Sequence, residues 1–257
     1  MMKVNGRIPN WRYPEASERD LSRLMQDATT DLVVEMRDRL DRLKFDATAE
    51  EINEAEDDIS EAAIAFFATV IAALASIGLT IYRFNSKQWL VVALAAGGRD
   101  NEAVMMLKEF GAGGYEQWYQ QALEKWQDTA KASIQKLTAD IVADWTTKVR
   151  TANNIGKTRE QIDEIIEGRY AIYGSWSRNR ASGIIGSFNS MLMMQRLKDA
   201  KVSHYFWFGM MDDRERESHI KLEGKRRRVN GDGIFPGEEY GCRCWAVPDF
   251  NNVEELQ

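Results

Sequence analysis

The chain is poor in the residues that carry redox and metal chemistry, with two cysteines and two histidines among 257 residues. Cys242 and Cys244 are separated by one residue, and a disulfide between them would close a small, strained loop. A disulfide framework is therefore excluded, which favours maturation in a reducing cytoplasm. The first 13 residues also lack the apolar core of a signal peptide, so we expect no secretory leader.

The chain also lacks a net positive charge. Its formal net charge of -6 excludes a protein that binds polyanions over its whole surface. The charge is nevertheless uneven, because residues 50–61 hold seven carboxylates and no base, whereas residues 214–228 hold seven Lys or Arg against three Glu. This asymmetry indicates that one end of the chain meets an acidic partner.

One apolar segment could contradict a soluble class. Residues 62–82 contain no charged side chain, and this length could cross a bilayer. Seven of the residues are alanines, and Thr69, Ser76 and Thr80 interrupt the run, so insertion gains little transfer free energy. The composition favours a buried helix in a bundle, where small residues allow close packing.

Apolar residues recur at intervals of three and four through most of the first 200 residues, which is the period of helices. We expect helices over 15–45, 48–82, 88–96, 101–110, 115–153, 158–168 and 171–200. Thr48 and Thr158 each precede a Glu or Gln by three residues, which is the spacing of a capping box. Asn85–Ser86 and Gly168 are expected to interrupt helices.

The composition changes after Lys201. Residues 202–208 are aromatic and β-branched, which is typical of a strand, and residues 209–250 are rich in glycine and charge. The sequence therefore predicts a mainly α protein, with a multi-helix body of long helices and a small C-terminal α+β, β-rich cap. The expected division is an irregular arm over 1–13, the helical body over 14–200, the cap over 201–250 and a short tail over 251–257.

The cap contains the densest chemistry of the chain. His219, Cys242 and Cys244 supply an imidazole and two thiols, which suit zinc, and Asp213 could supply a fourth ligand. Zinc sites usually space their cysteines by two to four residues, whereas these are separated by one. We therefore expect the thiols to be split, with one buried in a small core and the other near the surface.

A second interpretation of the same residues is nucleophilic catalysis. Cys242 or Cys244 would be the nucleophile, His219 the base and Asp213 the orienting group. No local signature of a cysteine hydrolase surrounds them. The other histidine, His204, is expected to be a core or interface residue of the aromatic strand.

A basic run, Lys225, Arg226, Arg227 and Arg228, could contact phosphates, because guanidinium groups match phosphate oxygens. In a strand only two of the four would share a face. The run could instead be a solvated turn, or pair with the carboxylates of residues 212–217. The nearby acids favour a modest contact to DNA or to an acidic protein surface over an independent DNA site.

The cap also carries an ordered motif. Its residues are Trp207, Asp213, Arg214, His219, Leu222, Gly224, Cys242, Arg243 and Cys244. This pattern resembles the C-terminal domain of the phage Mu F-like minor head proteins, the phage head-morphogenesis family. The resemblance is strong over residues 203–247 and loose over the rest of 84–250.

Two positions depart from the family pattern. Many members have a cysteine three residues before the histidine, which would complete a Cys₃His set, and this chain has Arg216 there. Members often carry Pro-Pro before the final Cys-Arg-Cys, and this chain has Pro236-Gly237. Because a thiolate is lost and a cation would repel a metal ion, we expect no cofactor, with zinc as the alternative.

The resemblance implies a structural minor capsid protein of a tailed bacteriophage, assembled in the host cytoplasm and placed in the virion near the portal or the inner capsid surface. Implied partners are the portal protein, the major capsid protein and packaged double-stranded DNA. A membrane would be met only if the protein leaves with the DNA during ejection. We expect no enzymatic activity. The rival functions are a Cys/His-dependent hydrolase or nuclease, and a zinc-stapled adaptor module.

Overall fold

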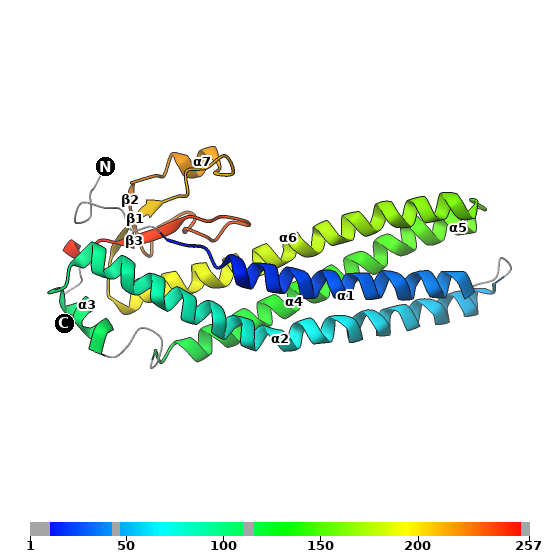
Figure 1. Cartoon of the computed structure of the whole chain (residues 1–257), viewed down its shortest axis with the longest axis horizontal. Coiled ribbons are helices and arrows are strands. Elements are labelled where there is room, and N and C mark those ends of the chain that lie inside the picture. The colour runs from blue at the N-terminus through cyan, green and yellow to red at the C-terminus, as the bar shows by residue number, and fades with distance from the viewer. Residues whose placement is uncertain (1–10, 43–46, 110–115, 253–257) are drawn as a thin grey trace. The chain divides into compact units, whose positions relative to one another are not determined.

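A computed structural model of the chain describes residues 11–42, 47–109 and 116–252 (Figure 1). Two compact units are present, and each is assembled from separate stretches of sequence. Unit 1 contains residues 1–17, 76–126 and 183–257, and unit 2 contains residues 18–75 and 127–182. The boundaries between the units thus fall inside long helices, whereas the sequence analysis predicted that each part of the protein is one continuous stretch of the chain. Most of the expected arm and tail lie outside the described residues.

The mainly α class with a small C-terminal sheet is confirmed. The elements are α1 (Glu15–Arg42), α2 (Ala49–Gly97), α3 (Glu102–Glu109), α4 (Tyr119–Trp145), a π-helical segment (Thr146–Arg150), α5 (Thr151–Asn154), α6 (Arg159–Asp199), β1 (His204–Phe208), α7 (Glu217–Ile220), β2 (Arg226–Arg228), β3 (Trp245–Pro248) and a 3-10 turn (Phe250–Asn252).

Both predicted capping boxes are confirmed. The amide of Thr48 donates to Glu51 Oε2 at 2.8 Å, and the amide of Glu51 donates to Thr48 Oγ1 at 3.2 Å. Thr158 and Gln161 make the same reciprocal pair, at 3.1 and 3.3 Å. Each box satisfies two amides that the first turn of a helix leaves without an intrahelical acceptor.

The expected interruption at Asn85–Ser86 is wrong, because α2 continues through both residues to Gly97. Both side chains are buried acceptors for one guanidinium of unit 1. Arg196 Nε donates to Asn85 Oδ1 at 2.7 Å, and Arg196 Nη2 donates to Ser86 Oγ at 2.6 Å. Asn85 and Ser86 are therefore stabilised within the helix by hydrogen bonds to Arg196, a residue far away in the sequence.

The expected end of a helix at Gly168 is also wrong, because α6 runs unbroken from Arg159 to Asp199. A glycine inside a helix costs only about 1 kcal/mol relative to alanine. The next turn is fixed in unit 2, where Arg169 Nε and Tyr173 Oη each donate to Asp144 Oδ2 at 2.7 Å. These two contacts offset the cost of the glycine.

Unit 2 is formed by α1 and by parts of α2, α4 and α6, which lie side by side (Figure 1). Its interior contains a buried hydroxyl pair, Thr29 Oγ1 and Ser177 Oγ, at 2.8 Å. Ion pairs at its surface include Arg39 with Asp58 at 2.5 Å. Such exposed pairs contribute little, so the apolar stripes of the helices supply most of the stability.

The apolar segment 62–82 is buried on one face only. Its buried side chains follow a heptad-like spacing at Ala63, Phe67, Val70, Leu74, Ile77 and Ile81, and Tyr82 is buried as well. Ile64 and Leu79 on the other face are 70% and 37% exposed. Among the described residues, α2 alone has the length and composition to cross a membrane, and 33% of its apolar window is buried. The expectation of a buried helix therefore holds for one face of this segment only.

Unit 1 carries an antiparallel sheet with strand order β2-β1-β3. His204 pairs with Arg228 on one side of β1, and Trp207 pairs with Ala246 on the other. The core under the sheet includes Trp11, Trp89, Val92, Val104, Met193, Leu197, Trp207, Trp245, Cys242 and Cys244. The cap thus shares one apolar core with α3 and with the C-terminal parts of α2 and α6.

Candidate metal centre

The segment after β1 is folded back over that strand by two backbone hydrogen bonds. The amide of Gly224 donates to Trp207 O at 2.8 Å, and the amide of Trp207 donates to Lys225 O at 3.0 Å. Gly224 has φ +68°, a conformation that a residue without Cβ adopts at low cost. This loop places α7, with His219, above the middle of the sheet.

A second loop, residues 235–244, brings the cysteines to the same place. The amide of Cys242 donates to Glu239 O at 2.9 Å, and the amide of Gly237 donates to Cys242 Sγ at 3.3 Å. Gly237 has φ +81° and Gly241 has φ +68°, so both sharp bends occur at glycine. Cys244 then leads directly into β3.

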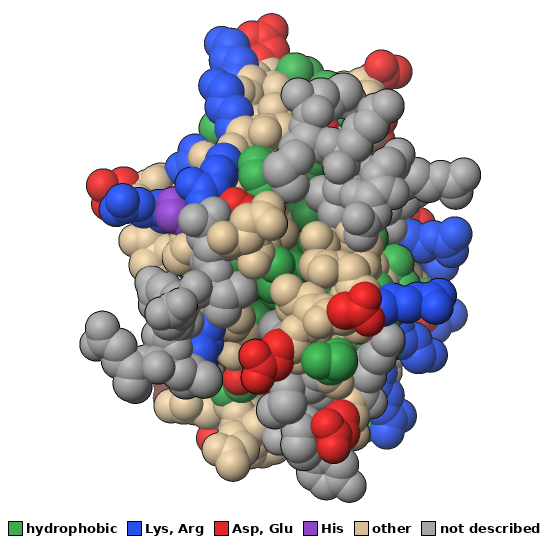
Figure 2. Space-filling view, turned by 90° about the vertical axis from the view of Figure 1, so that its left-hand side faces the viewer, with side chains coloured by type: hydrophobic (Ala, Val, Ile, Leu, Met, Phe, Trp, Pro, Cys, Tyr) green, Lys and Arg blue, Asp and Glu red, His purple; other side chains and the backbone are tan. Residues whose placement is uncertain are grey.

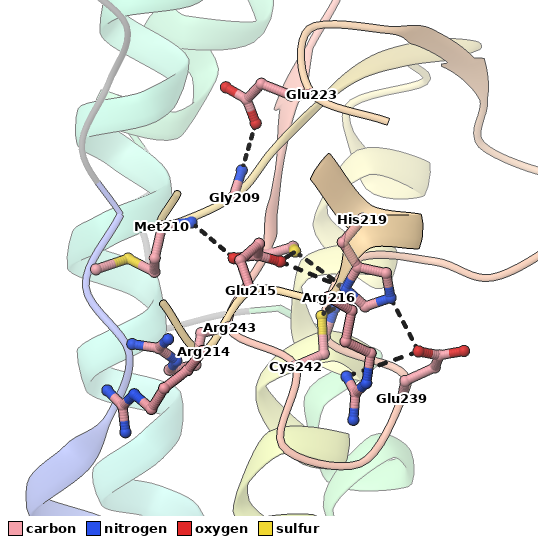
Figure 3. Close-up of polar contacts among 12 residues, drawn as sticks. Gly209, Met210, Arg214, Glu215, Arg216, His219, Glu223, Glu239, Cys242 and Arg243 are labelled. Atoms are coloured by element: carbon pink, nitrogen blue, oxygen red, sulfur yellow. Dashed lines mark hydrogen bonds and ion pairs between the residues drawn. The ribbon is translucent and has the colours of Figure 1, made fainter. Parts of the chain in front are cut away.

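The two loops meet in a buried cluster of one imidazole and two thiols (Figure 3). His219 Nδ1 lies 3.5 Å from Cys242 Sγ and 3.5 Å from Cys244 Sγ. Both cysteines are buried, with exposures of 4% and 2%. The expectation that the thiols are split is wrong, because residues i and i+2 of an extended segment direct their side chains to the same side.

The carboxylate next to this cluster is Glu215 and not Asp213. Glu215 Oε1 lies 2.9 Å from Cys244 Sγ and 3.4 Å from His219 Nδ1 (Figure 3). Its other oxygen accepts the amide of Met210 at 3.1 Å. Asp213 is exposed, so its expected place in the cluster is corrected. Glu215 lies before α7, and the extended backbone of Arg216 separates it from that helix, so no helical spacing in the sequence pointed to the pair.

A second carboxylate bonds the far side of the imidazole. Glu239 Oε2 lies 2.9 Å from His219 Nε2. Arg216 is paired with the same carboxylate at 3.7 Å and donates to Tyr240 O at 2.5 Å. The positive charge of Arg216 is thus paired outside the cluster, so its expected repulsion of a metal ion is weakened by Glu239.

The two thiols differ in acidity. The side-chain interaction with Cys244 lowers the pKa of Cys242 below the usual value for cysteine, and the amide of Gly237 acts in the same direction. The pKa of Cys244 is raised, first by its side-chain interaction with Cys242 and then by burial and by the hydrogen bond that its thiol donates to Glu215. Cys242 is therefore the first of the pair to ionise.

The remaining motif residues hold the loops around the cluster. Trp207 is fully buried, and its ring contacts the ring of His219 edge-on at 5.3 Å between centroids. Arg243 Nη2 donates to Asp212 Oδ1 at 2.5 Å, which lowers the pKa of Asp212. Leu222 packs against the core, whereas Arg214 is exposed. These contacts explain why the motif spans two loops.

Three residues of the basic run, Arg226, Arg227 and Arg228, form β2, an edge strand of the sheet, and Lys225 directly precedes it. Arg226 Nε pairs with Asp249 Oδ2 at 2.7 Å, and Arg227 Nη2 donates to Asp232 O at 2.9 Å. Lys225 and Arg228 are exposed and make no ion pair with the described residues. Pairing with the carboxylates of residues 212–217, one of the expected alternatives, is therefore wrong. Figure 2 shows Lys and Arg side chains gathered beside a histidine at its left-hand edge.

His204 borders this basic run and is half-buried at the start of β1, where its Nδ1 bonds Ser203 Oγ at 2.9 Å. Burial lowers the pKa of His204, and the positive charges of Arg226 and Arg228 lower it further. His204 is separate from the cysteine cluster, as the sequence predicted for a residue of the strand.

Comparison with known proteins gives no functional name. No family profile and no solved structure match the chain. A protein of Haemophilus influenzae, described as an uncharacterized protein, is 25% identical over 128 residues, which cover 47% of this chain and 29% of that protein. The chain thus matches less than a third of the length of this curated relative. The support for a function therefore comes from the geometry of the His219, Cys242 and Cys244 cluster and from the sequence motif of the cap.

Proposed function

We propose that the chain is a structural minor capsid protein of a tailed bacteriophage that acts in head morphogenesis. The observation that carries the proposal is the convergence of the motif residues. Trp207, His219, Cys242 and Cys244, which resemble the head-morphogenesis pattern and are spread over 38 positions, meet around one buried cluster. A motif whose members form one folded unit is better support for the resemblance than the spacing alone.

The burial of the cluster favours a structural function over the rival hydrolase or nuclease. A nucleophilic thiolate must reach a substrate carbon, and its base must stay within hydrogen-bond distance during attack. Both sulfurs are almost completely buried, and one face of His219 is covered by Trp207. The contacts that would align a cysteine thiolate with His219 therefore also prevent a substrate from reaching that thiolate.

The proposal assigns the portal protein, the major capsid protein or both as partners, and places the chain in the virion near the portal or the inner capsid surface. The test is the location of the chain in purified particles of the phage that encodes it. We expect an antibody or a tag on the chain to detect a few copies in each particle. Particles that lack the chain at every stage, while it accumulates free in the host, would overturn the proposal.

The proposal also includes a weak contact between β2 and packaged DNA. Lys225 and Arg228 are the two exposed cations of the run that make no ion pair within the described part of the chain. Neutralising both, in Lys225→Gln with Arg228→Gln, is expected to reduce the salt dependence of DNA binding by about two in the slope of log K against log salt. The readout is a titration with duplex DNA at several salt concentrations.

The control for this measurement removes the same charge from unit 2. Lys131 and Lys148 are exposed there, so Lys131→Gln with Lys148→Gln has the same net charge. We expect the control to keep the slope of the unaltered chain. Equal slopes for both double variants would contradict a DNA contact on β2.

A further inference from the structure

The separations of His219 Nδ1 from both sulfurs and from Glu215 match those between ligands of one tetrahedral ion, and the ligand atoms of His219, Cys242 and Cys244 all lie within 4.8 Å of one another. A zinc site with ligand distances of about 2.0–2.3 Å has ligand-to-ligand distances of about 3.3–3.8 Å. His219 Nδ1 lies 3.5 Å from each sulfur and 3.4 Å from Glu215 Oε1. The distance from Glu215 to the Cys244 sulfur is 2.9 Å, that of a hydrogen bond whose proton a metal ion would replace.

The chemistry of these donors selects the metal. Thiolate sulfur and imidazole nitrogen suit zinc, whereas magnesium and calcium prefer sets made only of oxygen. The carboxylate beside these three side chains is Glu215, which is 4% exposed and lies 3.4 Å from His219 Nδ1, so it is the candidate for the fourth ligand. A buried set of four with no position left for water has the form of a structural site and not of a catalytic one.

The surrounding contacts orient these ligands. Glu239 accepts from His219 Nε2, which directs the lone pair of Nδ1 toward the sulfurs. The amide of Met210 fixes one oxygen of Glu215, and the amide of Gly237 donates to the sulfur of Cys242. Metal sites in proteins generally have such an outer layer of hydrogen bonds, because it holds the ligands in place before binding.

We propose that Cys242, Cys244, His219 and Glu215 form a tetrahedral zinc site that fastens the two loops of the cap together. The strands of the cap are three to five residues long, so they bury little surface by themselves. A metal is one of the few devices that stabilise so small a segment. This site does not depend on the proposed function.

The first test measures metal in the full chain, produced in medium with zinc and purified without chelators. We expect about one zinc per chain by elemental analysis. We also expect that Co²⁺ added to the metal-free chain gives the visible absorption and the thiolate charge-transfer bands of a tetrahedral site. Zinc well below one per chain together with absent cobalt bands would overturn the proposal.

The second test identifies the fourth ligand by competition with a chromogenic chelator. Loss of a residue that only hydrogen-bonds a metal ligand weakens metal binding by about 10–100-fold. Glu215→Gln removes a direct ligand, so we expect it to weaken zinc binding by at least as much. Asp213→Asn, which changes a nearby exposed carboxylate, is the matched control and should bind like the unaltered chain. Equal affinity of Glu215→Gln and Asp213→Asn would overturn the assignment of Glu215.

Cys242→Ser, Cys244→Ser and His219→Ala should each lose the cobalt bands. Circular dichroism of the same samples distinguishes a lost ligand from a lost fold. If a folded Cys242→Ser variant retained the thiolate charge-transfer intensity of the unaltered chain, the site as drawn would be wrong. Glu239→Gln keeps all four ligands, so we expect it to keep the bands with an affinity about 10–100-fold lower.

Discussion

Arg196→Met is expected to lower the free energy of unfolding of unit 1 by about 3–5 kcal/mol, the cost of leaving one partner of a buried ion pair uncompensated. Arg196 is 1% exposed and is paired with Glu116. Burial lowers the pKa of Arg196, and the charge of Glu116 opposes this effect. Its guanidinium also lies 5.4 Å from the ring of Tyr82 and 5.5 Å from that of Trp118. Removing the guanidinium therefore leaves Glu116 without its ion-pair partner, and leaves the buried side chains of Asn85 and Ser86 without the donor that they accept from.

Urea denaturation followed by circular dichroism measures this effect. Lys198→Met, at an exposed position of the same helix and the same unit, is the matched control, and we expect it to change stability by about 0.5 kcal/mol or less. A second variant, Arg196→Met with Glu116→Leu, removes both charges and should recover part of the loss. A loss below about 1 kcal/mol in Arg196→Met would contradict the structural importance assigned to this network.

Trp207→Ala is the second large change, and we expect it to lower the free energy of unfolding by about 3–5 kcal/mol. We also expect it to disorder the cluster of His219, Cys242 and Cys244. Trp207 is fully buried in the central strand and supports the ring of His219. The cavity left by an indole cannot close without moving α7, because the backbone of Gly224 is bonded to that of Trp207. The loss should appear both in thermal unfolding and in zinc content.

Two further variants separate the role of Trp207 from general effects of substitution. Trp207→Phe retains an aromatic ring, so we expect less than half of the alanine loss and near-normal zinc content. Met211→Ala alters an exposed side chain four residues away and should leave both readouts unchanged. If Trp207→Ala lost stability but bound zinc like the unaltered chain, the proposed support of His219 by this ring would be refuted.

The helices and their starts could be predicted because their signals are local. Apolar periodicity and the capping boxes at Thr48 and Thr158 act within one or two turns of the chain. The false interruption at Asn85 arose from the same local reasoning. That polar side chain belongs to a network with Arg196, 111 positions away, and no short-range pattern records such a partner.

The site was predicted in part for a similar reason. His219 and the two cysteines are rare residue types, so the sequence pointed to them directly. Glu215 and Glu239 are two of 40 acidic residues, and only the turn before α7 and the loop before β3 select them. The choice of Asp213 failed because the chain turns outward at that residue, where the amide of Glu215 bonds Asp212 O at 2.9 Å.

The composition of the two units has a consequence for the order of events during synthesis. Unit 2 is complete once residue 182 has been made, because its two stretches end there. Unit 1 joins Trp11 to β3, so its core needs both the first and the last described parts of the chain. Because domains fold as their residues become available, the helices of unit 2 can assemble on the ribosome. The cysteine cluster can form only after Cys242, Cys244 and β3 have left the ribosome, and therefore later than the helices of unit 2.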